Sequence, residues 1–343
     1  MLGLQAKVTL ICPTVNRQNV LHCLYKRYNN PIFNVIIVDG SEEIWKNHIE
    51  INSKAGFEYI HLPGLTLSQR ITHSFDKIST PYSMLISDDD FVFISTLERW
   101  LKLLETQNGY NGVVGPILAV RRTEERPFGF NTFPYSHKCE YKFSYETNLV
   151  EKFRKHFSPY LPLIVFALLD TYIWKKSWEN AFKSSVLNVY GYAEHVFVMN
   201  SLILGEYLYD NQVFMIRFED LHSVRPEDDN IWGSTAEQNT ISKVCQGKAN
   251  ISYEELVCST SKYLPRIAYE SFSTVTIRQA IAIAISGIAY TSDNRVKIRT
   301  VKLPLRILFK FKKILTILLI KISIKLKIID DIAARTFFAL KVY

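Results

Sequence analysis

The stretch PYSMLISDDDFVF, residues 81–93, carries the pattern on which the fold prediction depends. Its first half, SMLIS, is apolar and typical of a buried strand, and Asp88, Asp89 and Asp90 follow directly. Adjacent carboxylates repel one another and are costly beside an apolar core. The pattern therefore indicates the end of a buried strand. Either a positive group lies among the carboxylates, or water solvates them as a turn or helix cap.

The segments before this stretch alternate between strand and helix patterns. Apolar, strand-like runs occur at 7–15, 33–41 and 57–62, with helix-like segments at 18–29 and 66–78. Continuous apolar strands separated by helices predict the α/β class, with a mostly parallel sheet flanked by helices. Ligands bind such sheets at the carboxyl ends of the strands. The polar residues at those ends are candidate site residues: Thr14, Asn16, Arg17, Asp39 and the Asp88–Asp90 triplet.

Beyond residue 110 the pattern is less regular. A larger set of elements is expected there: a strand pair at 110–120, a strand and helix within 162–182, a helix at 191–205 beginning near Glu194, a strand at 211–226 that leads into an acidic loop, and mostly helix at 235–290. The uncharged run 279–292 is too short to span a bilayer and predicts a buried helix.

Three segments resemble, in their order and spacing, the GT-A glycosyltransferases, and in particular family-2-like bacterial enzymes. These segments are CPTVNR at 12–17, NVIIVDGS at 34–41 and STPYSMLISDDDFVF at 79–93. The resemblance covers about the first 225 residues. It implies a Rossmann-like GT-A fold and the transfer of a sugar from a nucleotide-sugar donor. Many relatives have two acidic residues before Gly-Ser, whereas this chain has Val38-Asp39.

The resemblance implies how the donor is bound. Thr14, Asn16 and Arg17 would line the nucleotide pocket, and Asp39 would hydrogen-bond the base. Gln69 and Arg70, which precede the strand of the triplet, would also contact the donor. A solvated helix face is the alternative for Gln69 and Arg70.

The resemblance also gives each carboxylate of the triplet a role. Asp88 would contact the ribose side, Asp89 would shape the site and Asp90 would bind a divalent cation, Mn²⁺ or Mg²⁺. Such a cation neutralises a diphosphate leaving group as its bond to the sugar breaks. His222 would be a second metal ligand on a late loop, although a lone histidine is commonly structural. Arg217 would touch the diphosphate or pair with nearby acids.

Glu194, in GYAEHVF, is the candidate base. An inverting transfer needs a base within hydrogen-bond reach of the acceptor hydroxyl, and relatives place an acid at the start of a helix there. Carboxylates are also favoured at helix N-termini by the helix dipole, so a plain capping role is the alternative. His195 is expected to face outward, because residues i and i+1 do not share a helix face.

The charge of the chain is concentrated at its end. Residues 301–343 hold ten of the 41 Lys and Arg residues and two of the 33 acids, so they carry the whole formal charge of +8. Basic residues gather on one side of a helical wheel opposite Leu, Ile and Phe, which predicts a helix lying on an anionic membrane. An edge strand within 321–328, or burial against the body or a second subunit, is the alternative. Interleaved Ile and Leu and few aromatic residues argue against nucleic acid.

Together these features predict a GT-A catalytic domain at 1–225, with a nucleotide-binding half at 1–120 and an acceptor half at 121–225. A helical extension at 226–300 and a membrane-associating tail at 301–343 follow. The five cysteines form no CxxC pair and no secretory signal is apparent, so we expect a cytoplasmic, peripheral membrane protein. The expected acceptor is a surface or lipid-linked glycan. A degenerate membrane scaffold and a nucleotidyltransferase are the alternatives, although the first turn lacks the glycines of the latter.

Overall fold

The computed structural model describes residues 6–30, 32–123, 126–134, 148–157, 160, 163–183, 190–219, 241 and 243–293. The chain divides into two units, residues 1–121 with 132–295 and residues 122–131 with 296–343. The second unit is described only over parts of two strands, and the tail at 301–343 lies outside the described residues. The predicted division into catalytic halves, helical extension and tail stays a prediction.

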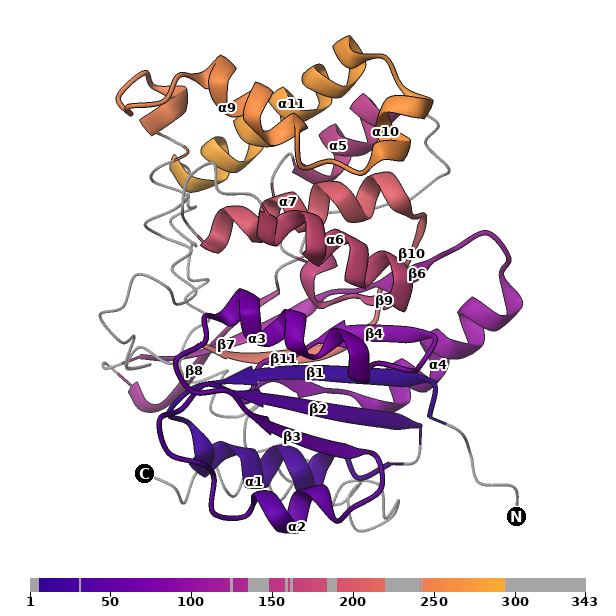
Figure 1. Cartoon of the computed structure of the whole chain (residues 1–343), viewed down its shortest axis with the longest axis vertical. Helices are drawn as coiled ribbons and strands as arrows, with labels where there is room; N and C mark the ends of the chain where they lie inside the picture. The colour runs from indigo at the N-terminus through magenta and orange to yellow at the C-terminus, as the bar shows by residue number, and fades with distance from the viewer. Residues whose placement is uncertain are drawn as a thin grey trace, which may run out of the picture. The chain divides into compact units, whose positions relative to one another are not determined.

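The first unit is built on a seven-stranded sheet in the order β10-β6-β9-β4-β1-β2-β3 (Figure 1). Parallel pairs join β4 to β1, β1 to β2, β2 to β3, and β10 to β6, whereas β9 runs antiparallel to β4 and β6. The strands are β1 (Val8–Thr14), β2 (Phe33–Asp39), β3 (Phe57–His61), β4 (Tyr82–Leu85), β6 (Gly112–Val114), β9 (Leu168–Asp170) and β10 (Tyr207–Tyr209). The predicted α/β class with a mostly parallel sheet is confirmed.

The central strands are buried because helices cover both faces of the sheet. In β2, Phe33 and the run Val35–Asp39 are all buried, as a continuous apolar strand requires. Right-handed crossovers place the helices after β1 and β2 on one face and the helix after β3 on the other, as Figure 1 shows. These connections are α1 (Gln18–Arg27), α2 (His48–Asn52), α3 (Leu67–His73) and the 3-10 helix η1 (Phe75–Lys77).

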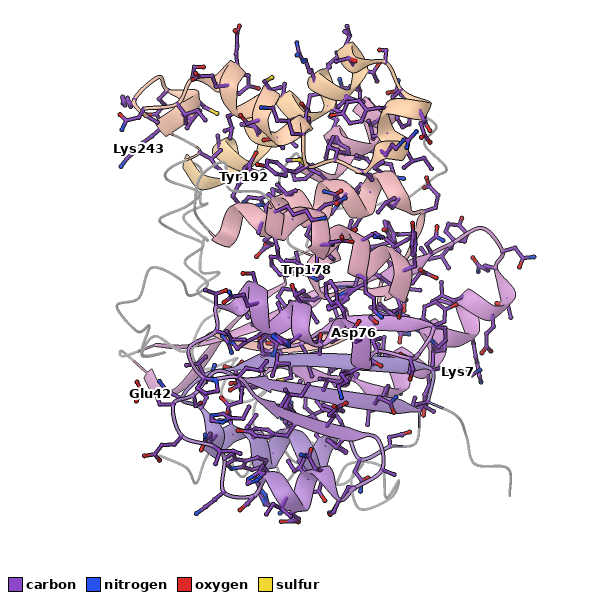
Figure 2. All side chains as sticks on the ribbon, viewed as in Figure 1. Lys7, Glu42, Asp76, Trp178, Tyr192 and Lys243 are labelled. Carbon is purple, nitrogen blue, oxygen red and sulfur yellow. The ribbon has the colours of Figure 1, made fainter. Side chains whose placement is uncertain are left out.

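The helices that follow the triplet add to the packing around the sheet. α6 packs against α7 and against β4 and β9. Trp178 of α6 is fully buried and stacks on Phe197 of α7, with ring centroids 4.2 Å apart, and Figure 2 labels it in this region. The elements are α4 (Ile94–Thr106), α5 (Leu149–Phe157), η2 (Ile164–Phe166), α6 (Thr171–Lys183) and α7 (Tyr190–Leu204). The predicted strand and helix within 162–182 are confirmed as β9 and α6.

A second sheet has the order β5-β11-β7-β8, with β5 (Phe91–Val92), β7 (Ile117–Thr123), β8 (Arg126–Pro134) and β11 (Met215–Glu219). β11 pairs antiparallel with β5, with Met215 opposite Val92 and Ile216 opposite Phe91. Since β5 begins directly after Asp90, this pairing brings β11 beside the triplet from more than 120 residues away in the chain.

Three later helices, α9 (Tyr253–Ser261), α10 (Arg266–Ser271) and α11 (Thr274–Asp293), form the end of the described chain. α11 packs against α5 and α9. Gly287 permits the close approach to α5, because an added Cβ would overlap the carbonyl oxygen of Phe157. Ile281, Ile285 and Ile288 are fully buried, which confirms the predicted buried helix. None of the helices within the described ranges is both long and apolar enough to cross a membrane.

Candidate active site

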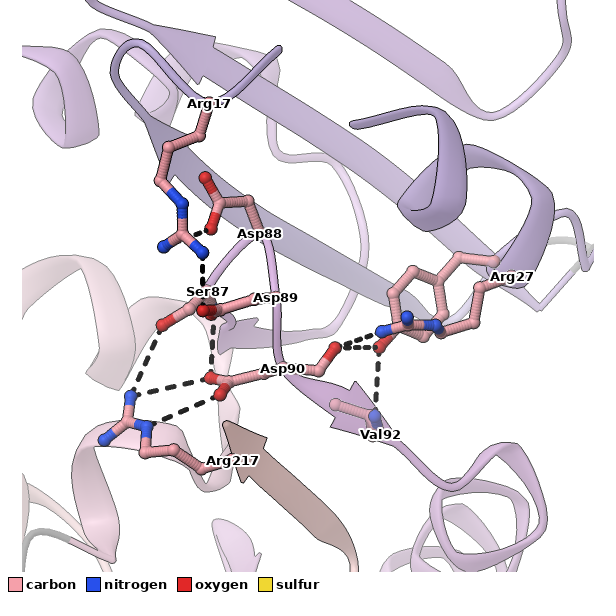
Figure 3. Close-up of polar contacts among 9 residues, drawn as sticks. Arg17, Arg27, Ser87, Asp88, Asp89, Asp90, Val92 and Arg217 are labelled. Carbon is pink, nitrogen blue, oxygen red and sulfur yellow. Dashed lines mark hydrogen bonds and ion pairs between the residues drawn. The ribbon is translucent and has the colours of Figure 1, made fainter. Parts of the chain in front are cut away.

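Three neighbouring strands bring the candidate residues to one edge of the main sheet. β1, β2 and β4 lie side by side in parallel, so the loops after them meet although they are up to 74 residues apart in the chain. Thr14 to Arg17 follow β1, Asp39 ends β2, and the triplet follows β4. Figure 3 shows the carboxylates of the triplet with the guanidinium groups of three arginines around them.

Asp88 and Asp89 share the guanidinium of Arg17. Arg17 Nη1 lies 3.0 Å from Asp88 Oδ1, and Arg17 Nη2 donates to Asp89 Oδ2 at 2.6 Å. The hydroxyl of Thr14 donates to Asp88 Oδ2 at 2.6 Å. Burial raises the pKa of Asp88 to about 6, although the Arg17 charge opposes this shift. The site therefore holds Asp88 in a partly desolvated state that needs a nearby positive charge.

Asp90 is fully buried and has other partners than Asp88 and Asp89. Its carboxylate accepts a hydrogen bond from the Ser87 backbone N–H at 3.1 Å and pairs with Arg217 Nε at 3.4 Å. Burial raises the pKa of Asp90, and the Arg217 charge opposes this rise. Arg217 stacks over the Phe166 ring at 4.0 Å, and Arg27 donates to the carbonyl oxygen of Asp90. The expected role of Asp90 as metal ligand stays a prediction, since Arg217 fills that position here.

Within the triplet, the pair Asp88 and Asp89 is the place whose chemistry fits a divalent cation. Asp88 and Asp89 each place one oxygen against the same guanidinium, which is the cation between them in this structure. Mg²⁺ sites in proteins commonly use one or two carboxylates, with phosphates and water as the other ligands. Among the residues that the structure describes, no three His, Cys, Asp or Glu side chains are grouped to hold a metal alone. A cation here would therefore need further oxygens from water or from a bound ligand.

Asp39, the expected base-binding residue, is fully buried and already accepts several hydrogen bonds. The Ser41 backbone N–H and Oγ donate to Asp39 Oδ1 at 2.8 and 2.5 Å. The Tyr59 hydroxyl donates to Asp39 Oδ2 at 2.6 Å, and Gln18 Nε2 donates to the same oxygen at 3.3 Å. Burial and the Asp39 carboxylate both raise the pKa of Tyr59. Asp39 thus fixes the turn after β2, and its contact with a base stays a prediction.

The turn after β1 is shaped by Asn16 and Arg70. Asn16 has a positive φ of 54° and donates its backbone N–H to Ser41 Oγ at 2.8 Å. Arg70 is buried, and its Nη1 donates to the carbonyl oxygens of Thr14 at 2.5 Å and Val38 at 3.3 Å. The solvated-face alternative is therefore wrong for Arg70, which ties the ends of β1 and β2 together.

Gln69 has a local role. Its side chain accepts from the Thr66 backbone N–H at 2.9 Å, and its own backbone N–H donates to Thr66 Oγ1, so the two residues form the capping box of α3. Contact of Gln69 or Arg70 with the donor stays a prediction.

Glu194 lies in the second turn of α7, because the helix begins at Tyr190, four residues earlier than expected. The Tyr160 hydroxyl donates to Glu194 Oε1 at 2.9 Å. The expectation that His195 faces outward is wrong: its side chain is 3% exposed and meets the Tyr160 ring edge to face at 4.5 Å. α7 buries residues on all sides, so the spacing rule for amphipathic helices does not decide its orientation.

Three residues at the site were not anticipated from sequence, Arg27, Tyr59 and Tyr160. Arg27 lies in the last turn of α1 and Tyr59 in the middle of a strand, and neither position carries a motif. The sequence around Arg27, Tyr-Lys-Arg-Tyr-Asn-Asn, carries no signal that could have drawn attention to it. His222 lies outside the described residues.

Comparisons with known proteins do not assign this chain to a family. No family model and no curated protein match the chain. Among solved structures, S. aureus TarS 1-349 is similar at 12% identity over 84% of this chain and 91% of that chain, with a TM-score of 0.43. Glucosyl-3-phosphoglycerate synthase from Mycobacterium tuberculosis, solved with Mn²⁺, UDP and glucosyl-3-phosphoglycerate, is similar at 12% identity over 76% and 81%, with a TM-score of 0.40. Scores this low assign neither a family nor an activity.

Proposed function

We propose that this protein is a glycosyltransferase that moves a sugar from a nucleoside-diphosphate sugar to a glycan acceptor. The observation that carries the proposal is the meeting of Asp88, Asp89 and Arg17 where β1 and β4 end (Figure 3). A parallel sheet binds ligands at this edge. A site that holds both carboxylates and arginines suits a diphosphate with an accompanying cation. The sequence resemblance to GT-A glycosyltransferases supports the same reaction class.

The donor site would be divided among three loops. The turn after β1, with Thr14, Asn16 and Arg17, and the Asp39 turn after β2 would hold the nucleoside. Asp88 and Asp89 would hold Mn²⁺ or Mg²⁺, with Asp90 a further ligand if Arg217 moves. When bound, such a cation offsets the charge that builds on the departing diphosphate. Arg17 and Arg217 would add positive charge on the protein side.

Glu194 would act as base in an inverting transfer. The hydrogen bond from the Tyr160 hydroxyl holds the Glu194 carboxylate in a fixed orientation, as a base that must meet the acceptor hydroxyl requires. η2 connects Glu194 with the proposed donor site. It packs against α7, which carries Glu194, and its Phe166 ring lies against the guanidinium of Arg217. His222 as a late-loop ligand belongs to this proposal from sequence alone.

The basic tail would place this reaction at a membrane. Its sequence pattern supports binding to the anionic cytoplasmic surface, where a lipid-linked or surface glycan is the acceptor. Sedimentation of the full chain with vesicles tests this: binding to phosphatidylcholine vesicles with added phosphatidylglycerol should fall as salt rises. Equal binding to purely neutral vesicles would contradict it.

Thermal unfolding of the full chain tests the donor. UDP, GDP, CDP and CMP are compared with and without Mn²⁺. A ligand at about a hundred times its Kd stabilises the native state by roughly 2.7 kcal/mol, which raises Tm by on the order of 5 °C for a chain of this size. We expect one nucleoside diphosphate to raise Tm in the presence of Mn²⁺, and Asp89→Asn to abolish the shift. Asp89 is chosen because its side chain is 21% exposed and its replacement leaves the core intact.

A catalytically degenerate scaffold is the second candidate function. One observation favours it: Asp88, Asp89 and Asp90 are each paired with an arginine in this structure. A scaffold would show no Tm shift with any nucleotide, and Asp89→Asn would leave its function unchanged. The nucleotidyltransferase alternative gains no support from the described residues, and a shift with CMP but with no diphosphate would favour it.

A further inference from the structure

Three arginines surround the triplet, but they differ in how firmly they are held. Arg27 is 8% exposed and contacts the backbone oxygen of Asp90. Arg217 is 20% exposed and pairs with fully buried Asp90. Arg17 is 41% exposed, on a loop, and precedes α1 as an N-cap residue whose side chain makes no cap hydrogen bond. Arg17 is therefore the arginine that can leave at the smallest cost in burial.

The contacts of Arg17 are those of a counter-ion between two acids. Two nitrogens of its one guanidinium reach carboxylates on two successive residues, Asp88 at 3.0 Å and Asp89 at 2.6 Å. Asp88 is 4% exposed, so its charge has little water to stabilise it. If Arg17 left without a replacement, two adjacent carboxylates would repel one another. A cation that brings at least one positive charge must take its place.

We propose that Arg17 is an exchangeable counter-ion of the donor site: it holds Asp88 and Asp89 together in the free protein and moves to the donor diphosphate when a divalent cation binds that pair. This inference rests on the proposed function. The charges favour the exchange. Asp88 and Asp89 with a divalent cation are neutral, so the guanidinium of Arg17, which is 41% exposed, can then pair with the negative phosphates of the donor.

The exchange predicts that removing the Arg17 charge changes two affinities in opposite directions, that for Mn²⁺ and that for the nucleoside diphosphate. Arg17→Gln keeps a polar, although shorter, side chain and removes the competing charge. Without nucleotide, the full-length variant should bind Mn²⁺ more tightly than the wild type, by on the order of tenfold. With Mn²⁺ present, it should bind the nucleoside diphosphate more weakly, by a similar factor. A residue that merely stabilises the loop would not change the two affinities in opposite directions.

Electron paramagnetic resonance of free Mn²⁺ measures the first affinity, and equilibrium dialysis of the nucleoside diphosphate measures the second. Lys26→Gln is the matched control, because it removes one positive charge from an exposed position on α1. Arg17→Lys is the second variant: it keeps the charge but has one nitrogen where Arg17 uses two, and its Mn²⁺ affinity should fall between the wild type and Arg17→Gln. Arg17→Lys decides the question if Arg17→Gln fails to fold.

The outcomes separate this inference from the proposed function. Mn²⁺ affinity that is unchanged or weaker in both Arg17 variants overturns the exchange, even if the nucleotide still binds. The exchange is also overturned if neither the wild type nor the variants bind Mn²⁺ in the absence of nucleotide. Tighter Mn²⁺ binding by Arg17→Gln, with no nucleoside diphosphate bound by any form, would support displacement of Arg17 but refute both its transfer to the diphosphate and the glycosyltransferase proposal.

Discussion

Acid should destabilise this protein through His195. The side chain is 3% exposed, and its Nδ1 has no hydrogen-bond partner within the described part of the chain. Burial lowers the pKa of His195 from 6.5 to about 3. Between these two pH values the unfolded chain binds a proton at this histidine and the folded chain does not. Stability is therefore complete above pH 6.5 and falls as the pH drops towards 3.

The size of the effect follows from the two pKa values. At pH 5 the proton taken up by the unfolded histidine lowers the free energy of unfolding by about 2 kcal/mol, whereas at pH 7.5 the loss is close to zero. Urea denaturation of the full chain at pH 7.5 and pH 5 measures the difference. His195→Phe, which keeps an aromatic ring against Tyr160, should remove about 2 kcal/mol of the acid-induced loss.

His22→Gln is the control, since it removes a histidine from an exposed position on α1. An equal loss of stability between pH 7.5 and pH 5 in His195→Phe and the wild type would refute the reasoning. It would mean that His195 is protonated in the folded state as readily as in the unfolded chain.

Three further predictions concern buried contacts. Arg217→Met should lower the free energy of unfolding by about 3 kcal/mol because it leaves buried Asp90 without its cation, and adding Asp90→Asn should recover part of this; no recovery in urea denaturation would contradict the pairing. Gly287→Ala should cost about 2 kcal/mol through overlap with α5, and an unchanged urea midpoint would exclude that close approach. If Glu194 is the base, as proposed, Tyr160→Phe should lower kcat about tenfold, or 1.4 kcal/mol, with no change in nucleotide Kd; an unchanged kcat would show that Tyr160 does not assist Glu194.

The parts of the fold that follow from local pattern could be predicted from the sequence. Strand-like runs gave β1, β2 and β3 at the correct places. In β1 and β2 the apolar run is continuous, because strands covered by helices on both faces have no polar side to interrupt it. The position of Asp88 at a strand end followed from the same reasoning. These features depend on neighbours within a few residues.

The partners of the carboxylates could not be predicted, because they come from distant parts of the chain. Arg17 meets Asp89 across 72 residues, and Arg217 meets Asp90 across 127. The pairing of β11 with β5 decides the second contact, and both strands are short. The burial of His195 was missed for a related reason, since only the packing of α7 among other helices determines it.

The position of β9 has a consequence for how the protein could be divided or recombined. This strand, at residues 168–170, is inserted between β4 and β6, both of which lie before residue 121. A cut near residue 120 would therefore remove a strand from inside the sheet and expose the edges of β4 and β6 to pairing with other chains. Under the proposed function, the parts of the chain that would bind the donor and the acceptor therefore could not be exchanged as separate pieces. A chimera that exchanges acceptor specificity with another protein would have to keep β9 of this chain, and a nick in the loop before it should leave the two fragments associated.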